Sequence, residues 1–219
     1  MAKWMWIIAG PNGAGKSTFT NDLLANAPDL LKLNADERTA ALRAADANAA
    51  QRDLNLQAAR EIDAEVVDCI AKGRSFLVET VLSSDKYRDD VLEAKRQGFK
   101  VALVYVSLHP PELSPDRVAT RVTKGGHNVD RQTAIDRHAR SHVQLAWFAA
   151  KADVLAIYDN SHNDGTPQLI AERAEGQKLR VHARGINPSV DKALRLDDRP
   201  VRRKRKRDAE PTIPCKRAA

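Results

Sequence analysis

Short runs of apolar residues alternate along the chain with longer segments in which apolar residues recur every three or four positions. The short runs predict buried strands, and the longer spacing predicts helices. Alternation between the two favours a parallel sheet covered by helices on both faces. The predicted strands are residues 4–9, 30–34, 75–81, 100–107 and 154–158. The predicted helices are residues 38–72, 85–98, 115–124 and 131–150.

The polar segment after the last predicted strand and the length of the chain together predict the domain organisation. After Asn160 the chain becomes polar and is interrupted by glycine and proline, which predicts a hairpin and a short helix. A chain of 219 residues favours a single domain, which we assign to residues 1–194. The predicted fold class is therefore α/β, with a doubly wound parallel sheet of about five strands.

The net charge of +7 would suggest a nucleic-acid partner if it were spread over the whole protein. Residues 195–219 hold ten basic and four acidic side chains, so they supply +6 and leave +1 for the rest. This like-charged segment contains three prolines and predicts a basic, disordered tail. We expect nucleic-acid contact, if any, only through this tail and without sequence specificity.

The cysteines and the lengths of the apolar runs indicate the compartment in which the protein is expected to act. The two cysteines, Cys69 and Cys215, form no disulfide framework, which is typical of a reducing, cytoplasmic compartment. No stretch reaches the roughly 18 uninterrupted apolar residues of a membrane span, so no membrane partner is expected.

A glycine-rich segment between the first predicted strand and a following helix matches the phosphate-binding pattern G-x-x-x-x-G-K-[ST]. In this pattern, backbone N–H groups surround the phosphates, the lysine reaches the β- and γ-phosphates, and the serine hydroxyl contacts Mg²⁺. The sequence thus predicts a site for ATP and Mg²⁺, with Ser17 as the metal ligand. The predicted nucleotide-binding residues of this loop are Gly10, Pro11, Asn12, Gly13, Ala14, Gly15, Lys16, Ser17 and Thr18.

Polar residues follow three other predicted strands. In a doubly wound sheet, ligands bind outside the carboxyl ends of the strands. The residues at these ends are Asp36, Glu79, Thr80, Asp159 and Asn160. A base for phosphoryl transfer is needed across the crevice from the γ-phosphate, and Asp36 stands at a suitable strand end. The alternative for Asp36 is a helix N-cap.

Arginines accumulate between the fourth and fifth predicted strands. Arg117 and Arg121 share one helix face, Arg137 and Arg140 share another, and Gly125-Gly126 joins the two helices. Such a segment could form a lid whose arginines stabilise charge on a transferring phosphoryl group. The alternative is a pair of solvated helices with surface ion pairs.

Five segments together resemble the zeta toxin family, the P-loop kinases of bacterial toxin–antitoxin systems, in its compact branch. They are residues 9–19, 33–36, 76–80, 121–129 and 158–161, and the resemblance spans residues 4–161. It implies an ATP-dependent and Mg²⁺-dependent kinase that phosphorylates a hydroxyl of UDP-N-acetylglucosamine or a related UDP-sugar. It also implies a small antitoxin protein as partner.

The resemblance implies a role for each matching residue. Asp36 would be the general base, and Glu79 and Thr80 would hold the acceptor sugar. Arg121 and either Arg137 or Arg140 would clamp the phosphates. Asp159 and Asn160 would border the adenine.

Two other functions remain open from the sequence alone. One is a nucleoside or metabolite kinase, or a plain ATPase, of the same fold. The other is an ATP-switched protein that docks on nucleic acid through its basic tail.

Overall fold

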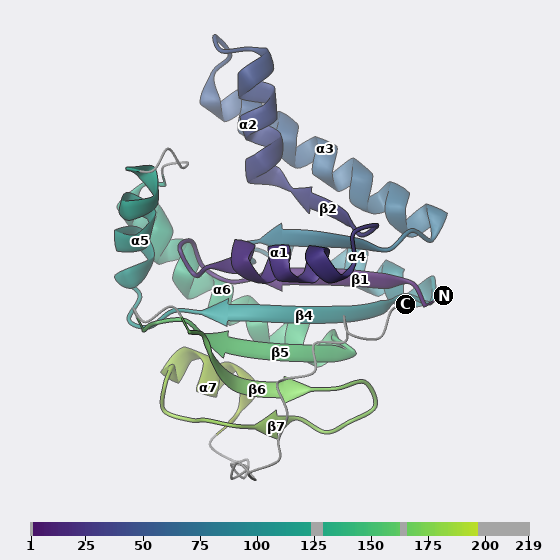
Figure 1. The fold of residues 1–219 in the computed structure, drawn as a ribbon, viewed down its shortest axis with the longest axis vertical. Helices are drawn as coiled ribbons and strands as arrows, with labels where there is room; N and C mark the ends of the chain where they lie inside the picture. The colour runs from purple at the N-terminus through teal and green to yellow at the C-terminus, as the bar shows by residue number, and fades with distance from the viewer. Residues whose placement is uncertain (1, 124–128, 163–165, 197–219) are drawn as a thin grey trace.

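The computed structural model describes residues 2–123, 129–162 and 166–196. Within them a seven-stranded sheet has the order β2-β3-β1-β4-β5-β6-β7 (Figure 1). The strands are β1 (Trp4–Ala9), β2 (Leu31–Asn34), β3 (Phe76–Thr80), β4 (Lys100–Ser107), β5 (Val154–Asp159), β6 (Gln168–Arg173) and β7 (Arg180–Val181). The first five are parallel, and β6 and β7 continue the sheet in antiparallel fashion.

Seven helices accompany this sheet in the described residues. They are α1 (Lys16–Asn26), α2 (Ala35–Ala45), α3 (Gln51–Lys72), α4 (Arg88–Arg96), α5 (Leu113–Val122), α6 (Arg131–Lys151) and α7 (Pro188–Leu194). In Figure 1, α1 covers the front face, α6 and α7 lie behind the sheet, and α2 with the first half of α3 extends beyond β2. The α5 helix stands beyond the carboxyl ends of the parallel strands.

The core explains why the apolar runs form strands covered on both sides. Side chains alternate between the two faces of a strand, so successive residues of β1 enter different clusters. Met5 and Ile7 pack in the larger cluster, with residues of α3, α4, α6 and α7. Trp6 and Ile8 pack in the smaller one, with Leu23 of α1. Strand β1 is thereby held rigidly at the centre of the sheet, where it delivers the glycine-rich segment.

The predicted α/β class with a mostly parallel sheet is confirmed, and the hairpin and short helix expected after Asn160 appear as β6, β7 and α7. The predicted helix over residues 38–72 is two helices, because the chain turns back at residues 46–50. Helix α2 begins at Ala35, directly after β2, where the Asn34 side chain accepts hydrogen bonds from the backbone N–H groups of Asp36 and Glu37.

Two predicted features fall outside the described residues. They are the centre of the arginine lid, residues 124–128, and the basic tail, apart from Arg195 and Leu196. In the part of the chain that the structure describes, no helix is both long and apolar enough to cross a membrane.

Candidate functional site

The glycine-rich segment forms a tight loop between β1 and α1. A side chain at Gly10 would place its Cβ 2.0 Å from the main-chain oxygen of Val106 in β4, so only glycine fits there. At Gly13 the Cβ would lie 2.9 Å from the Cβ of Arg117. Lys16 folds back over the loop, and its Nζ donates to the carbonyl oxygens of Gly10 at 3.0 Å and Pro11 at 3.1 Å.

The loop presents a positive surface. The first turn of α1 contains no acidic residue of its own, although the Glu79 carboxylate of β3 contacts Ser17 there. The backbone N–H groups at such a helix start, together with the Lys16 ammonium, suit a phosphate group. The local geometry is therefore that of an anion site.

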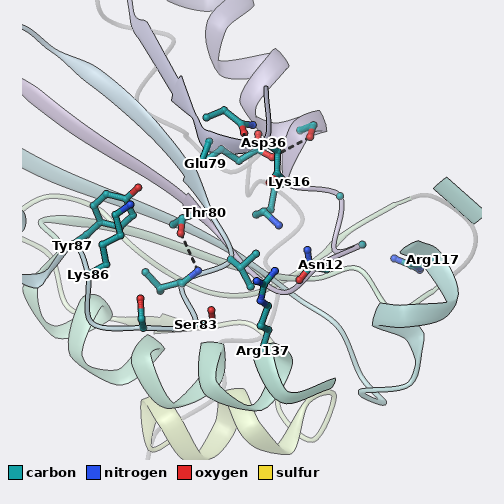
Figure 2. Close-up of a pocket in the computed structure, with 18 residues that line it drawn as sticks. Asn12, Lys16, Asp36, Glu79, Thr80, Ser83, Lys86, Tyr87, Arg117 and Arg137 are labelled. Atoms are coloured by element: carbon teal, nitrogen blue, oxygen red, sulfur yellow. Dashed lines mark hydrogen bonds between the residues drawn. The ribbon is translucent and has the colours of Figure 1, made fainter. Parts of the chain in front are cut away.

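A cavity of about 390 Å³ opens in front of this loop (Figure 2). Its walls come from the glycine-rich loop, the start of α2, the end of β3 with the segment that follows, and the arginine-bearing helices. The predicted residues that line it are Asn12, Gly13, Gly15, Lys16, Ser17, Asp36, Glu79, Thr80, Arg117 and Arg137. The fold thus brings residues from four separate regions of the chain to one cavity.

Asp36 lies in the first turn of α2 and lines the same cavity as Lys16 (Figure 2). Because Asn34 supplies the helix cap, the Asp36 carboxylate is not needed to begin the helix. Helix α2 is in turn fixed to α3 by Arg38, whose guanidinium donates to Glu61 at 2.7 Å and Glu65 at 2.6 Å. These ion pairs lower the pKa of Glu61 and raise that of Arg38, chiefly through the hydrogen bonds between them.

Glu79 lies at the end of β3, paired in register with Ile8 of β1, and this places it next to the phosphate-binding loop. Its Oε1 accepts a hydrogen bond from Ser17 Oγ at 3.1 Å, and its Oε2 accepts one from Thr20 Oγ1 at 2.8 Å. The neighbouring Thr80 accepts from the backbone N–H of Leu82 at 3.1 Å. Leu82 is buried and has φ +59°, a left-handed conformation that turns the chain along the cavity wall.

The described arginines have different positions. Arg137 of α6 is half-buried and lines the cavity, whereas Arg140 is exposed and does not. Arg121 lies in the last turn of α5. Arg117 lines the cavity and donates to the carbonyl oxygens of Ser161 at 3.4 Å and His162 at 3.2 Å. Of the two alternatives on α6, only Arg137 lines this cavity.

The residues at the end of β5 support the loop and do not line the cavity. Asp159 is fully buried and accepts from Ser107 Oγ at 3.0 Å and from the backbone N–H of Ser161 at 2.9 Å. Asn160 donates its side-chain amide to the carbonyl oxygen of Ala14 at 2.9 Å. The structure therefore ties this strand end to the phosphate-binding loop but does not expose Asp159 to a ligand.

Several cavity residues were not predicted from the sequence. The segment between β3 and α4 contributes Ser83, Ser84, Lys86 and Tyr87. Lys86 forms an ion pair with Asp63 of α3 at 2.6 Å. No motif marks these residues, since their position depends on the turn at Leu82.

Helix α6 is anchored behind the cavity by buried polar contacts. His138 Nε2 lies 2.8 Å from the carbonyl oxygen of Leu108, and Ser141 Oγ donates to the carbonyl oxygen of Val81 at 2.7 Å. His142 Nδ1 donates to the carbonyl oxygen of His138 at 2.9 Å. Burial lowers the pKa of His142 to about 4, so this histidine is neutral at pH 7. These contacts fix the helix that carries Arg137.

Side-chain oxygen atoms lie beside the phosphate-binding loop, where a divalent cation bound with the phosphates would be placed. The structure describes no group of three or more His, Cys, Asp or Glu side chains that could hold a metal ion by itself. The Ser17 hydroxyl and the Glu79 carboxylate, 3.1 Å apart, are oxygen donors of the kind Mg²⁺ prefers. They fit an ion that takes its other ligands from phosphate and water.

Comparison with solved structures gives the same architecture. The AvrRxo1-ORF1–ORF2 complex crystallised with ATP matches with a TM-score of 0.67 at 15% identity, over 83% of this chain and 60% of that one. The present chain thus spans less than two thirds of that protein. The PezAT chromosomal toxin–antitoxin system of Streptococcus pneumoniae matches with a TM-score of 0.56 at 16% identity, over 76% of this chain and 69% of that one.

At the level of sequence, no curated protein matches the chain. A family model described as an AAA domain matches residues 5–151, which is about two thirds of the chain and includes the phosphate-binding loop, Asp36, Glu79 and Arg137. The fold is P-loop kinase-like, and the chain belongs to this AAA domain family.

Proposed function

We propose that the protein is an ATP-dependent kinase that transfers the γ-phosphate to a hydroxyl of a UDP-activated sugar such as UDP-N-acetylglucosamine, as the toxin of a toxin–antitoxin pair. One observation carries the kinase assignment: Lys16 of the phosphate-binding loop and Asp36, an acidic residue from a different strand end, line the same cavity of about 390 Å³. This is the arrangement that positions a hydroxyl and a phosphoryl group against each other.

The donor nucleotide would lie with its phosphates against the loop. The backbone N–H groups at the start of α1 and the Lys16 ammonium would bind the β- and γ-phosphates. Arg137 from α6 and Arg117 from α5, which line the cavity, would bind the phosphates together with Arg121. Cationic groups that are already in position stabilise the charge that develops on the transferring phosphoryl group, which is the main catalytic effect in phosphoryl transfer. Asn160 and Asp159 would border the adenine, and the bond from Asn160 to Ala14 ties this strand end to the phosphate-binding loop.

The acceptor would lie on the side of Asp36, Thr80 and the segment at Ser83. Its hydroxyl oxygen forms the new bond to the γ-phosphorus, and the bond from that phosphorus to the β,γ-bridging oxygen breaks. The hydroxyl proton passes to the Asp36 carboxylate, and ADP leaves. Asp36 is exposed on the wall of the cavity, where it can exchange this proton with solvent after the transfer.

Mg²⁺ would be held by Ser17 on the protein side, with Glu79 next to it. When bound, it neutralises phosphate charge and orients the phosphates. The chain's contribution is to hold the Ser17 hydroxyl towards the phosphates.

The comparisons support individual parts of this proposal. One matching structure was solved with ATP, and another belongs to a toxin–antitoxin system. The UDP-sugar acceptor and the small antitoxin partner rest on the resemblance of the sequence motifs to the zeta toxin family. A cytoplasmic location would provide both ATP and the UDP-sugar.

The test is an acceptor panel with purified protein and Mg-ATP, with phosphorylated products identified by mass spectrometry. A phosphorylated UDP-sugar is the expected result. Phosphorylation of a nucleoside or another metabolite instead, or ATP hydrolysis with no acceptor product, would contradict the UDP-sugar assignment. Deleting residues 197–219 serves as a control, because the kinase reaction should not need the basic tail.

A further inference from the structure

Thr20 makes a contact that the mechanism above does not use. It is fully buried in α1, and its Oγ1 donates to Glu79 Oε2 at 2.8 Å. The other carboxylate oxygen of Glu79 accepts from Ser17 Oγ at 3.1 Å. Two hydroxyls of one helix, three residues apart and therefore on the same helix face, thus bind the two oxygens of one carboxylate. Glu79 and Ser17 line the cavity, whereas Thr20 lies behind them and does not.

This arrangement fixes the direction of the Ser17 lone pairs. A serine hydroxyl has one proton and two acceptor lone pairs. With its proton directed to Glu79, the Ser17 oxygen keeps its lone pairs for a cation on the cavity side. A carboxylate that accepts the proton of a ligating group orients that ligand and increases its basicity. A flexible glutamate does this well only if its own carboxylate is held, and Thr20 holds it.

We propose that Thr20 is a positioning residue: it fixes the Glu79 carboxylate against Ser17, so that the Ser17 oxygen is presented to the divalent cation bound with the nucleotide. The proposal rests on the proposed function insofar as the loop must bind a nucleotide. It also assigns Glu79 to the cation side of the cavity, in place of the acceptor side that the motif resemblance implies.

The test measures how much Mg²⁺ strengthens nucleotide binding, without any turnover. Calorimetric titration of AMPPNP is carried out once in EDTA and once in excess Mg²⁺, and the ratio of the two Kd values is compared between variants. Thr20→Val has nearly the same shape but lacks the hydroxyl. It should bind AMPPNP like the wild type in EDTA but lose about tenfold of the Mg²⁺ enhancement, the lower end of the effect of removing an outer-shell partner. Thr20→Ser keeps the hydroxyl and should restore the enhancement.

A matched control separates positioning from the loss of a buried hydroxyl as such. Thr39 is also buried in a helix, and its hydroxyl donates to the carbonyl oxygen of Ala35 within α2. Thr39→Val should therefore leave the Mg²⁺ enhancement unchanged.

Three results would overturn the proposal. One is a Thr20→Val protein with the wild-type Mg²⁺ enhancement, and another is equal loss of affinity in EDTA and in Mg²⁺, which would indicate a distorted loop. The third, measured for Thr20→Val in a separate turnover assay, is an altered KM for the acceptor with unchanged Mg²⁺ dependence, which would return Glu79 to the acceptor side while the proposed kinase function stands. Failure of the wild type to bind AMPPNP in either condition would contradict both the proposed function and this inference.

Discussion

Replacing Asp36 by Asn separates a catalytic role from a structural one because the two roles predict effects of different size. Asn34 caps α2, and the first turn contains a second acidic residue, Glu37. The structural cost is therefore the loss of one exposed charge near the positive end of a helix, about 0.3–1 kcal/mol. Loss of a general base lowers kcat by roughly 10²–10⁴-fold, which corresponds to about 2.7–5.4 kcal/mol in the activation barrier.

Glu37→Gln is the matched control for this experiment. Glu37 lies in the same helical turn, but it is exposed, pairs with Lys32 and does not line the cavity. Both variants should lose a similar, small amount of stability in thermal unfolding, and both should bind AMPPNP like the wild type. Only Asp36→Asn should lose kcat in a phosphoryl-transfer assay. A kcat for Asp36→Asn within about threefold of that for Glu37→Gln would refute the role of Asp36 as base.

Three further predictions concern the arginines, the loop and the pH dependence of stability. Arg137→Ala should lower kcat at least a hundredfold, as expected for a transition-state arginine, whereas Arg140→Ala should stay near the wild type; equal effects would contradict the assignment. Gly10→Ala should abolish AMPPNP binding measured by calorimetry, because the new Cβ would overlap a main-chain oxygen of β4; unchanged affinity would contradict the loop geometry. His142 should contribute a fall of up to about 3 kcal/mol to the free energy of unfolding between pH 6.5 and 4, because its pKa is lowered to about 4 in the fold and only the unfolded chain takes up the proton in that range. Burial raises the pKa of Asp90 to about 6, which acts in the opposite direction, so the His142 contribution is measured as the difference between the wild type and His142→Leu in denaturant titrations at the two pH values; the absence of a difference would contradict it.

The sequence predicts the elements whose formation depends on local patterning. The apolar run of β1 and the glycine-rich motif after it determine the centre of the sheet and the phosphate-binding loop. The break between α2 and α3 was not predicted, because alanines with high helix propensity run through it. The turn is held by side-chain bonds to its own backbone, from Arg43 to the carbonyl oxygens of Ala47 and Ala49, which helix propensity does not reveal.

The sequence predicts which strand ends meet at the site. It does not predict which of the side chains at these ends point into the cavity. Asp36 and Asp159 both follow predicted strands, yet Asp36 lines the cavity and Asp159 is buried against Ser107. The difference lies in the packing partners, since a serine on the neighbouring strand β4 faces Asp159. The contribution of Ser83 depends on the buried left-handed turn at Leu82, which a sequence pattern does not reveal.

The central claim is that one cavity brings the nucleotide phosphates and a UDP-sugar hydroxyl together. The most direct measurement is the transfer of labelled phosphate from [γ-³²P]ATP to UDP-N-acetylglucosamine by the wild-type protein, with Asp36→Asn measured alongside. The expected result is a labelled UDP-sugar with the wild type and at least a hundredfold less with the variant, at unchanged AMPPNP affinity. Absence of labelled UDP-sugar with the wild type, or equal labelling by both proteins, would contradict it.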